Sequence, residues 1–253
     1  MVHGGQDSAG GARGVFITFE GGDGAGKSTH IRFLAKALRR HGLEVVSLRE
    51  PGGTPIGEKL RQVVLDPGNG ELSDESELLV FEAARAQLVS EVIKPALERG
   101  AVVLCDRFTD STLAYQACGR GLSAEFVRRA NEFACQGVCP CRTILLVAGG
   151  SAASLKRATR RGADRIERGG AAFHERVMEG FLEAARREPE RIRTVESAGK
   201  RSDTARAVFA QLADLFPWMA DELDDGRLFA QLDRPPRRRN RGGRPARKEG
   251  GRG

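Results

Sequence analysis

Long apolar runs are missing from this 253-residue sequence. No stretch reaches the length of about eighteen apolar residues that a transmembrane helix needs. The first residues, 1–14, are polar and rich in glycine, and they lack the apolar core of a secretory signal peptide. We therefore expect neither a membrane span nor export.

Cysteine is scarce, and its spacing is not that of a zinc site. The chain has five cysteines, an odd number that argues against a disulfide framework and, without a signal peptide, favours the cytoplasm. Cys135, Cys139 and Cys141 lie close together, but the C-x-x-C spacing of zinc ligands is absent. Buried or loop thiols are the favoured interpretation, with a metal site as the alternative.

Most of the chain has no excess of basic over acidic residues, although the net charge of the whole chain is +7. Residues 235–253 hold eight of the 41 basic and one of the 34 acidic residues, so residues 1–234 carry 33 of each. This Pro-, Gly- and Arg-rich segment has almost nothing to bury, and we expect it to be disordered. It could make a weak contact with RNA or another polyanion, or it could serve only as a solubilising extension.

The most informative motif follows an apolar stretch, Val15–Phe19, that predicts a buried strand. The pattern G-x-x-x-x-G-K-[ST] is met by Gly21, Gly26, Lys27 and Ser28, and a helical pattern begins directly after it. This is the strand, loop and helix order of a P-loop, in which backbone amides and a helix N-terminus surround phosphate groups. Lys27 is expected to reach the β- and γ-phosphates of ATP, and Ser28 to hold Mg²⁺. The predicted ATP-binding residues are Gly21, Gly22, Asp23, Gly24, Ala25, Gly26, Lys27, Ser28 and Thr29.

Apolar strands alternate with helical segments along the chain, which predicts an α/β fold with a parallel sheet covered on both faces. We expect a P-loop NTPase-type three-layer sandwich with five parallel strands and a helical lid. The expected regions are a flexible extension at 1–13, one domain at 14–217 and a basic, disordered tail at 218–253. The expected strands are Val15–Phe19, Glu44–Leu48, Ala101–Cys105, Thr143–Val147 and Arg191–Glu196. The longest expected helix is Asp74–Arg99, and further helices are expected at Ile56–Leu65, Ser123–Gln136, Ala152–Arg161, Phe173–Arg187 and Ser202–Phe216.

Two further patterns carry charge that suits phosphoryl transfer. Asp106 and Arg107 follow the third strand, where an acid is placed to hold Mg²⁺ beside the P-loop. The segment 155–167 contains Arg157, Arg160, Arg161 and Arg165; it is either a solvated basic helix end or a lid whose arginines close on phosphoryl oxygens. The P-loop itself carries no arginine, which favours the lid. No asparagine is followed by lysine, so the guanine-reading motif of GTPases is absent.

Several segments together resemble the bacterial thymidylate kinases. The segments FEGGDGAGKST, REPGGTPIGEKLR, DRFTDSTLAYQACGRGL and LKRATRRGADRIE occur in the order and at the spacing of that family. The resemblance covers about residues 14–216 and implies transfer of a phosphoryl group from ATP to dTMP, with Mg²⁺ as cofactor and a homodimer as the assembly.

The resemblance also implies roles for individual side chains. Phe81 matches the ring that stacks on thymine, although a core position is the alternative, and Arg85 matches the residue that hydrogen-bonds the base. Tyr115 matches the ring that excludes a ribose 2′-hydroxyl. The implied catalytic residues are Lys27, Arg107, Arg161 and Arg165, and the implied metal ligands are Ser28 and Asp106. The implied substrate-binding residues are Asp23, Arg49, Glu50, Phe81, Arg85, Arg107, Ser111, Thr112, Tyr115 and Gln116.

The sequence departs from the family pattern at several positions. The fourth strand ends in Val147-Ala148-Gly149 without the usual acid, Cys118 stands where glycine is common, and Glu82 replaces an uncharged neighbour of the stacking ring. Two competing functions are a kinase of another nucleoside monophosphate and a nucleotide- or RNA-binding protein built on a decayed kinase body. The residues of the P-loop and of the Asp-Arg pair are intact, which argues against decay.

Overall fold

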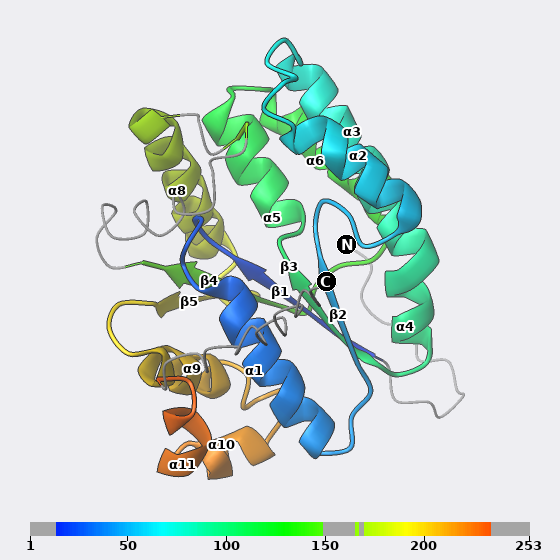
Figure 1. Cartoon of the computed structure of the whole chain (residues 1–253). Helices are drawn as coiled ribbons and strands as arrows, with labels where there is room; N and C mark the ends of the chain where they lie inside the picture. Colours follow the sequence, from blue (N-terminus) through cyan, green and yellow to red (C-terminus); the bar gives the residue numbers. More distant parts are fainter. Residues whose placement is uncertain (1–13, 149–164, 167–169, 234–253) are drawn as a thin grey trace, which may run out of the picture.

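A five-stranded parallel sheet organises the chain (Figure 1). The computed structural model describes residues 14–148, 165–166 and 170–233. The strands lie in the order β2-β3-β1-β4-β5, and every neighbouring pair is parallel. The strands are β1 (Val15–Glu20), β2 (Val45–Arg49), β3 (Val102–Asp106), β4 (Arg142–Val147) and β5 (Ile192–Glu196).

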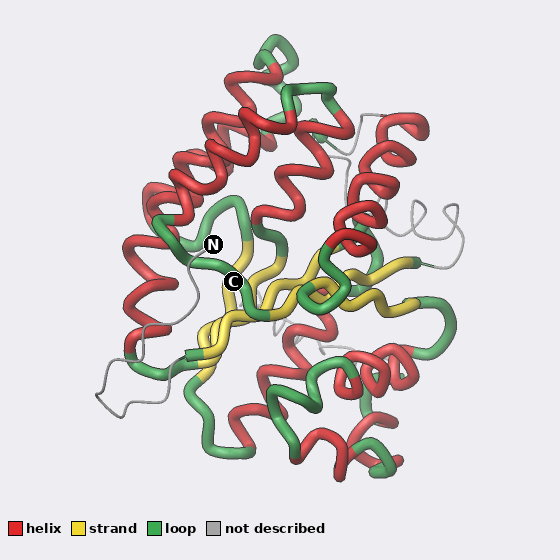
Figure 2. Tube along the Cα trace, turned by 180° about the vertical axis from the view of Figure 1, so that it is seen from behind, coloured by secondary structure: helices red, strands yellow, loops and turns green. Residues whose placement is uncertain are grey.

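Helices cover both faces of the sheet, which Figure 2 shows from behind as a twisted layer between two groups of helices. No helix among the described residues is long and apolar enough to cross a bilayer. On one face lie α1 (Lys27–Arg40), α9 (Arg201–Ala210), α10 (Trp218–Glu222) and α11 (Gly226–Ala230). On the other face, and extending above it, lie α2 (Pro55–Leu65), α3 (Asp74–Leu88), η1 (Val89–Ile93), α4 (Lys94–Glu98), α5 (Thr109–Thr112), η2 (Leu113–Gly119), α6 (Ala124–Cys135) and α8 (Gly170–Arg187).

Alternate residues of the central strand β1 enter different cores. Ile17 and Phe19 belong to the core under α1 and α9, whereas Phe16 packs with η1 and α4 on the opposite face. Successive side chains of a strand point to opposite faces, so a strand covered on both sides is apolar at nearly every position. This burial explains why β1 was recognisable from the sequence.

Most of the expected elements recur with small shifts, but the expected helix at 202–216 ends as α9 at Ala210. All five strands are present within about one residue of their expected ends, and the expected helix at 74–99 is the continuous run α3, η1 and α4. The short helices α5 and η2 were not expected; they occupy the segment after Asp106. The expected helix at 152–161 and the expected extension at 1–13 lie outside the described residues.

Residues after 217 are not all tail, contrary to the expected boundary. The helices α10 and α11 pack on α1 and α9, where Met219 and Phe229 are fully buried and Leu228 is 5% exposed. The Trp218 ring stacks on the ring of His41 at the end of α1, with centroids 3.6 Å apart. Apolar side chains at 218–232 therefore extend the packed body to at least Asp233, and the basic segment at 234–253 lies outside the described residues.

We expect two truncations of this region to behave differently. Ending the chain after Phe216 removes the buried side chains of α10 and α11, each of which contributes about 1.5–3 kcal/mol. Part of this gain is offset by the entropy of ordering the segment, so we expect a net loss of about 2 kcal/mol and a midpoint of thermal unfolding lower by about 4–8 °C.

A chain that ends after Asp233 is the matched control, and its melting midpoint should stay within about 1 °C of that of the full chain, because a basic segment without apolar side chains adds little to folding. Equal midpoints for the two truncated chains would show that α10 and α11 do not stabilise the body.

Candidate active site

The glycine-rich loop 21–26 joins β1 to α1. Gly21, Gly24 and Gly26 have φ angles of 120°, 76° and 98°, in the region that glycine adopts at little cost. A Cβ at Gly21 would lie 2.2 Å from the carbonyl oxygen of Leu146 on β4, so a side chain does not fit there. The helix that follows has no side-chain cap and no acid in its first turn, which leaves its N-terminal amides and positive dipole end available to an anion.

Lys27, the first residue of α1, points its ammonium group back into this loop. Its Nζ donates to the carbonyl oxygens of Gly21 at 2.9 Å and Gly22 at 3.0 Å, and the residue is only 7% exposed. Burial and the nearby charge of Arg107 lower the pKa of Lys27 to about 8, against the opposing effect of Asp106. A phosphate group at the loop would favour the charged form of this amine.

Ser28 and Asp106 bring two oxygen ligands together. The Ser28 Oγ donates to the Asp106 Oδ2 at 2.7 Å. Asp106 ends β3 and is paired with Phe19 of β1, so it lies at the sheet edge where the P-loop begins, because the carboxyl ends of parallel strands share one edge. Hydroxyl and carboxylate oxygens are ligands that Mg²⁺ prefers, together with water and substrate phosphates. This pair fits a magnesium ion bound with a nucleotide.

Arg107 bridges the end of β3 and the P-loop. Its NH2 donates to the Asp23 Oδ1 at 2.6 Å, and its NH1 donates to the Gly21 carbonyl at 3.2 Å and to the Ser111 Oγ at 3.1 Å. Burial raises the pKa of Asp23, but the charges of Arg107 and Lys27 outweigh it and bring that pKa to about 2. Asp23 is therefore an anion at any pH near neutrality, held beside two cations.

Tyr115 completes this part of the site. Its ring lies under the Arg107 guanidinium, 5.0 Å from ring centroid to the central carbon, and its hydroxyl is 3.5 Å from the Asp23 Oδ2. Phe173 and Phe181 of α8 contact the ring by their edges, with centroids 6.0 Å and 6.2 Å away. The ring is thus held on several sides, as a residue that excludes a substituent needs to be.

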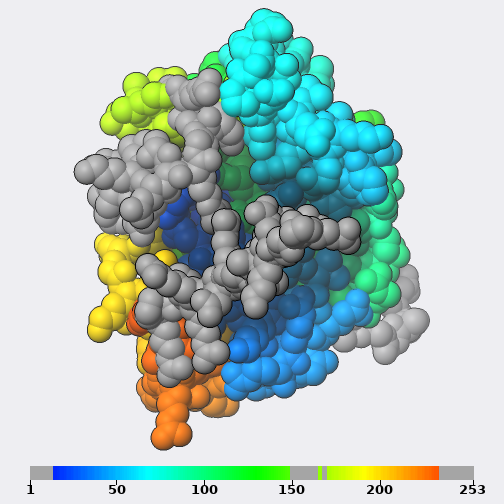
Figure 3. Space-filling view, in the orientation of Figure 1, coloured from blue at the N-terminus to red at the C-terminus, as the bar shows by residue number. Residues whose placement is uncertain are grey.

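A hollow lies between the cyan α2–α3 helices and the blue N-terminal segment in the space-filling view (Figure 3). Phe81 of α3 is half-buried and packs with Tyr115 and Ile166 in one apolar cluster. Thr112 is buried, with 4% exposed. An aromatic ring from α3 therefore packs against the apolar cluster that contains Tyr115.

Gln116 bonds to a buried acid on α3. Its Nε2 donates to the Glu77 Oε1 at 2.7 Å, and Arg120 NH2 donates to the Glu77 Oε2 at 3.1 Å. Arg165 also donates to this carboxylate through its NH2, and its Nε donates to the Val64 carbonyl at 3.1 Å. The contacts of Arg165 are thus with α2 and α3, and its catalytic role remains a prediction, as does that of Arg161, which lies outside the described residues.

Arg85 is almost wholly enclosed, with 2% exposed. It donates to Glu50 through Nε at 3.0 Å and NH2 at 2.6 Å, and its NH1 donates to Glu82 at 2.9 Å and to Asn131. Two buried carboxylates therefore share one guanidinium, and the expected bond from Arg85 to a base stays a prediction. Arg49, expected beside the substrate, forms an exposed ion pair with Glu58 at 2.9 Å.

Two buried acids behind the site, Glu20 and Glu77, were not predicted from the sequence. Glu20, the last residue of β1, is fully buried, and burial together with the charge of Asp110 raises its pKa to about 8. Glu77 is also fully buried, one helical turn before Phe81. An acid that ends an apolar strand was a usable signal for Glu20, whereas Glu77 stands among other acids at the start of a helix and offered none.

We expect Glu82→Gln to gain stability over the wild type as pH rises. Burial raises the pKa of Glu82 above 4.5, only partly offset by Arg85, so the folded state holds a proton more tightly than the unfolded state and wild-type stability falls as pH rises above about 4.5. Glutamine cannot ionise, but it can still accept from Arg85. Thermal unfolding at pH 5 and pH 8 should show a smaller loss of stability between these two pH values in the variant than in the wild type.

Glu50→Gln is the comparison: burial also raises the pKa of Glu50 against the charge of Arg85, so this variant should flatten the pH dependence too, but it loses the two-armed pair with Arg85 that Glu82 does not make. We expect this variant to be destabilised by about 3 kcal/mol. A Glu82→Gln variant that loses stability with pH as steeply as the wild type would contradict the raised pKa of Glu82.

Comparison with known proteins gives one consistent result. The model of the family described as "Thymidylate kinase" matches residues 19–208. The thymidylate kinase of Geobacter sulfurreducens is 48% identical over 210 residues, which cover 81% of this chain and 99% of that protein. The thymidylate kinase of Symbiobacterium thermophilum is 46% identical over 203 residues, covering 80% and 94% of the two chains.

A solved structure agrees with these sequences. The crystal structure of thymidylate kinase from Ehrlichia chaffeensis superposes with a TM-score of 0.65 at 32% identity, over 79% of this chain and 98% of the other. The P-loop, the Asp-Arg pair and the aromatic residues around Asp23 thus occur in a chain whose whole body matches one family. This chain belongs to the thymidylate kinase family.

Proposed function

We infer that this chain transfers the γ-phosphoryl group of ATP to dTMP, giving dTDP and ADP. Family membership supports this activity. The observation that carries it is the Arg107–Asp23 ion pair, which joins the P-loop to a second group of polar residues at one sheet edge. The competing functions, a kinase of another nucleoside monophosphate and a decayed kinase body, are not favoured.

The donor side consists of the loop 21–26 and the start of α1. Backbone amides and the helix N-terminus bind the phosphates of ATP, and the Lys27 ammonium neutralises charge on the β- and γ-phosphates. Ser28 and Asp106 hold Mg²⁺, which offsets charge on the transferring group when it is bound. Enclosure of Lys27 in the loop keeps the ammonium directed at this place.

The acceptor side is built around Asp23, Arg107 and Tyr115. The phosphate of dTMP is largely dianionic near neutral pH, so its oxygen attacks without a strong general base. Arg107 binds that phosphate and the charge that develops on it, which is the main need of phosphoryl transfer. Phe81 offers a flat apolar surface for the base, and Asp23 an acceptor for the sugar 3′-hydroxyl.

Four finer proposals accompany this function. We place the enzyme in the cytoplasm, which its five free cysteines suit. We propose a homodimer formed through α3 and α6, where Leu79, Phe126 and Phe133 are 56%, 55% and 85% exposed. Mg²⁺ is the proposed cofactor. A contact of segment 235–253 with RNA stays a prediction.

A panel of acceptors tests the function. ADP release should be measured with ATP and, in turn, dTMP, dUMP, UMP, AMP and CMP. We expect dTMP to give a kcat/KM at least about tenfold above the others, because stacking and hydrogen bonds to the base add to phosphate binding. The Lys27→Ala variant is the control, and its kcat should fall by about a hundredfold or more.

Equal rates with all five acceptors would remove the assignment to dTMP but not the kinase chemistry. No ADP release with any acceptor would point to the nucleotide-binding alternative. A correctly folded Lys27→Ala variant with near-normal turnover would show that another cation serves the phosphates.

Tyr115→Ala should relax the discrimination against ribonucleotides. The ring is 8% exposed and held by Arg107, Phe173 and Phe181, so it rejects a 2′-hydroxyl by occupying its space. We expect the ratio of kcat/KM for dTMP to that for ribothymidine monophosphate to fall about tenfold or more.

Tyr115→Phe is the matched control, because it keeps the ring and loses only the hydroxyl near Asp23. This variant should retain most of the discrimination. An unchanged ratio in Tyr115→Ala would show that the 2′-position is read elsewhere.

A further inference from the structure

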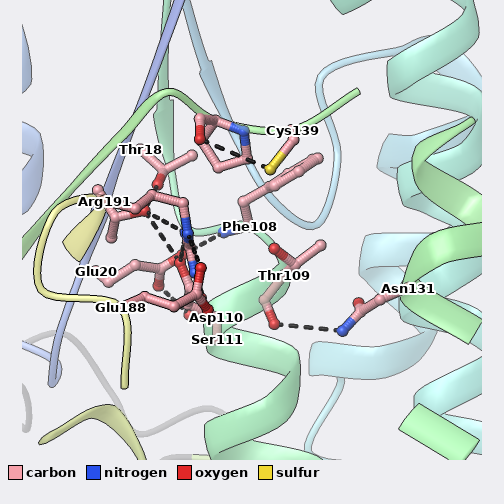
Figure 4. A network of polar contacts seen from close by, with 12 residues as sticks. Thr18, Glu20, Phe108, Thr109, Asp110, Ser111, Asn131, Cys139, Glu188 and Arg191 are labelled. Carbon is pink, nitrogen blue, oxygen red and sulfur yellow. Dashed lines mark hydrogen bonds and ion pairs between the residues drawn. The ribbon is translucent and has the colours of Figure 1, made fainter. Parts of the chain in front are cut away.

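Glu20 is a buried acid that the phosphoryl-transfer chemistry does not use directly. It ends β1 and is fully buried, yet both carboxylate oxygens are occupied. Oε1 accepts from the backbone N–H of Phe108 at 2.7 Å, and Oε2 accepts from the Ser111 hydroxyl at 2.5 Å. Figure 4 shows the carboxylate directed at the start of α5. Burying a charge is costly unless it is fully bonded, so its place here needs an explanation.

Both partners of Glu20 adjoin Arg107. Phe108 is the next residue in the chain, and Arg107 itself has a φ of 74°, a conformation that non-glycine residues seldom adopt and that the surroundings must hold. The Arg107 N–H donates to the Phe19 carbonyl at 3.0 Å. Strand β1 therefore fixes the backbone on both sides of the strained residue. Phe19 accepts from the N–H of Arg107, and Glu20 accepts from the N–H of the next residue, Phe108.

The Ser111 hydroxyl links Glu20 to the Arg107 guanidinium. A serine hydroxyl has one hydrogen and two lone pairs. Because Ser111 donates its hydrogen to Glu20, a lone pair is left to accept from Arg107 NH1 at 3.1 Å. The contact of 2.5 Å is in the range of a charge-assisted O–H···O⁻ bond. In its ionised form, the carboxylate therefore sets the direction of a short chain of hydrogen bonds that ends on the guanidinium; the protonated acid would not.

A second buried network lies beside this one and does not contact Arg107. The Thr18 and Thr143 hydroxyls are 2.7 Å apart, and Thr143 and Arg191 both donate to Asp110, at 3.0 Å and 2.8 Å. Thr18 lies two residues before Glu20 on the same face of β1 and is equally buried. It is therefore a matched position for separating a general cost of burial from an effect on Arg107.

We propose that Glu20 is a positioning residue for phosphoryl transfer, which fixes the Arg107 turn through Phe108 and directs the Arg107 guanidinium through Ser111. Glu20 touches no substrate itself. The proposal rests on the proposed role of Arg107 at the phosphate.

Three single variants test the proposal at saturating ATP and dTMP. Glu20→Ala removes both contacts and should lower kcat by about ten- to a hundredfold, the cost of misplacing a charge at a reacting centre. Glu20→Gln keeps an acceptor for Phe108 but turns a donor toward Ser111, so it should restore part of the loss. Thr18→Val should keep kcat within about twofold of the wild type, whatever its melting midpoint.

The pH profile gives a readout that a merely structural role would not move. Glutamine resembles the protonated acid, so the ratio of wild-type to Glu20→Gln kcat should rise from near one at pH 6.5 to about ten at pH 8.5, as Glu20 ionises. The other titratable and charged groups that face Glu20 are Lys27, Cys105, Arg107, Asp110, Tyr115 and, through Asp110, Arg191. The Glu20 charge raises the pKa of Lys27, but at saturating ATP a phosphate beside Lys27 keeps this amine charged over the whole pH range, so the ratio reports the ionisation of Glu20.

Coupling through Ser111 is tested by a double variant. If Glu20 acts through Ser111, Glu20→Gln combined with Ser111→Ala should lose no more than about twofold beyond Ser111→Ala alone. Three results would each overturn the proposal. The first is a double variant whose loss of kcat is the product of the two single losses. The second is a wild-type to Glu20→Gln ratio of kcat that does not change with pH, and the third is a loss of kcat in Glu20→Ala no larger than that in Thr18→Val. Arg107→Ala separates a failure of the proposed role of Arg107 from a failure of the role of Glu20. Normal turnover in Arg107→Ala would show that Arg107 does not serve the phosphate. A large loss of turnover in Arg107→Ala, together with normal turnover in the Glu20 variants, would show that Arg107 acts without help from Glu20.

Discussion

The parallel pairing of β1 with β3 is the constraint on which the site depends. It sets Phe19 opposite Asp106, so the P-loop and the Asp106–Arg107 turn leave the sheet at the same edge. A hydrogen bond from Ser28 to Asp106 and an ion pair between Arg107 and Asp23 then join them. A shift of one residue would turn the side chains of β3 to the wrong faces, and both contacts would be lost.

Buried charge is the main cost of this arrangement. Arg107 pairs with Asp23 and Arg85 with Glu50, whereas the buried Lys27 ammonium donates to two backbone carbonyl groups. Such groups stabilise a fold little compared with apolar packing, and removing one partner leaves the other uncompensated. The apolar cores on both faces of the sheet supply the stability that offsets them, and α10 and α11 add to the core beneath α1. The site is therefore rigid where charge must be placed and costly to alter.

Much of this could be anticipated from local patterns. The strand ends followed from apolar runs that are buried on both faces, and the P-loop followed from glycine spacing, which reflects a backbone requirement at Gly21. The boundary at 217 was placed too early, because α10 and α11 are only five residues long each and lie next to acidic and basic stretches. The segment after Asp106 gave no helical signal, since α5 and η2 are short and held by contacts to β1 and α8 rather than by their own periodicity.

The sequence by itself determined the parallel α/β architecture, the glycine-rich loop between β1 and α1 and the family, because these depend on short-range periodicity, glycine conformation and motif spacing. Only the tertiary structure decided which charges meet. Glu20 is joined to Ser111 across 91 positions, and Arg85 to Glu50 across 35. Such pairs form where strand order and helix packing bring distant segments together, and the energy of a buried charge depends on that enclosure rather than on its neighbours in the chain.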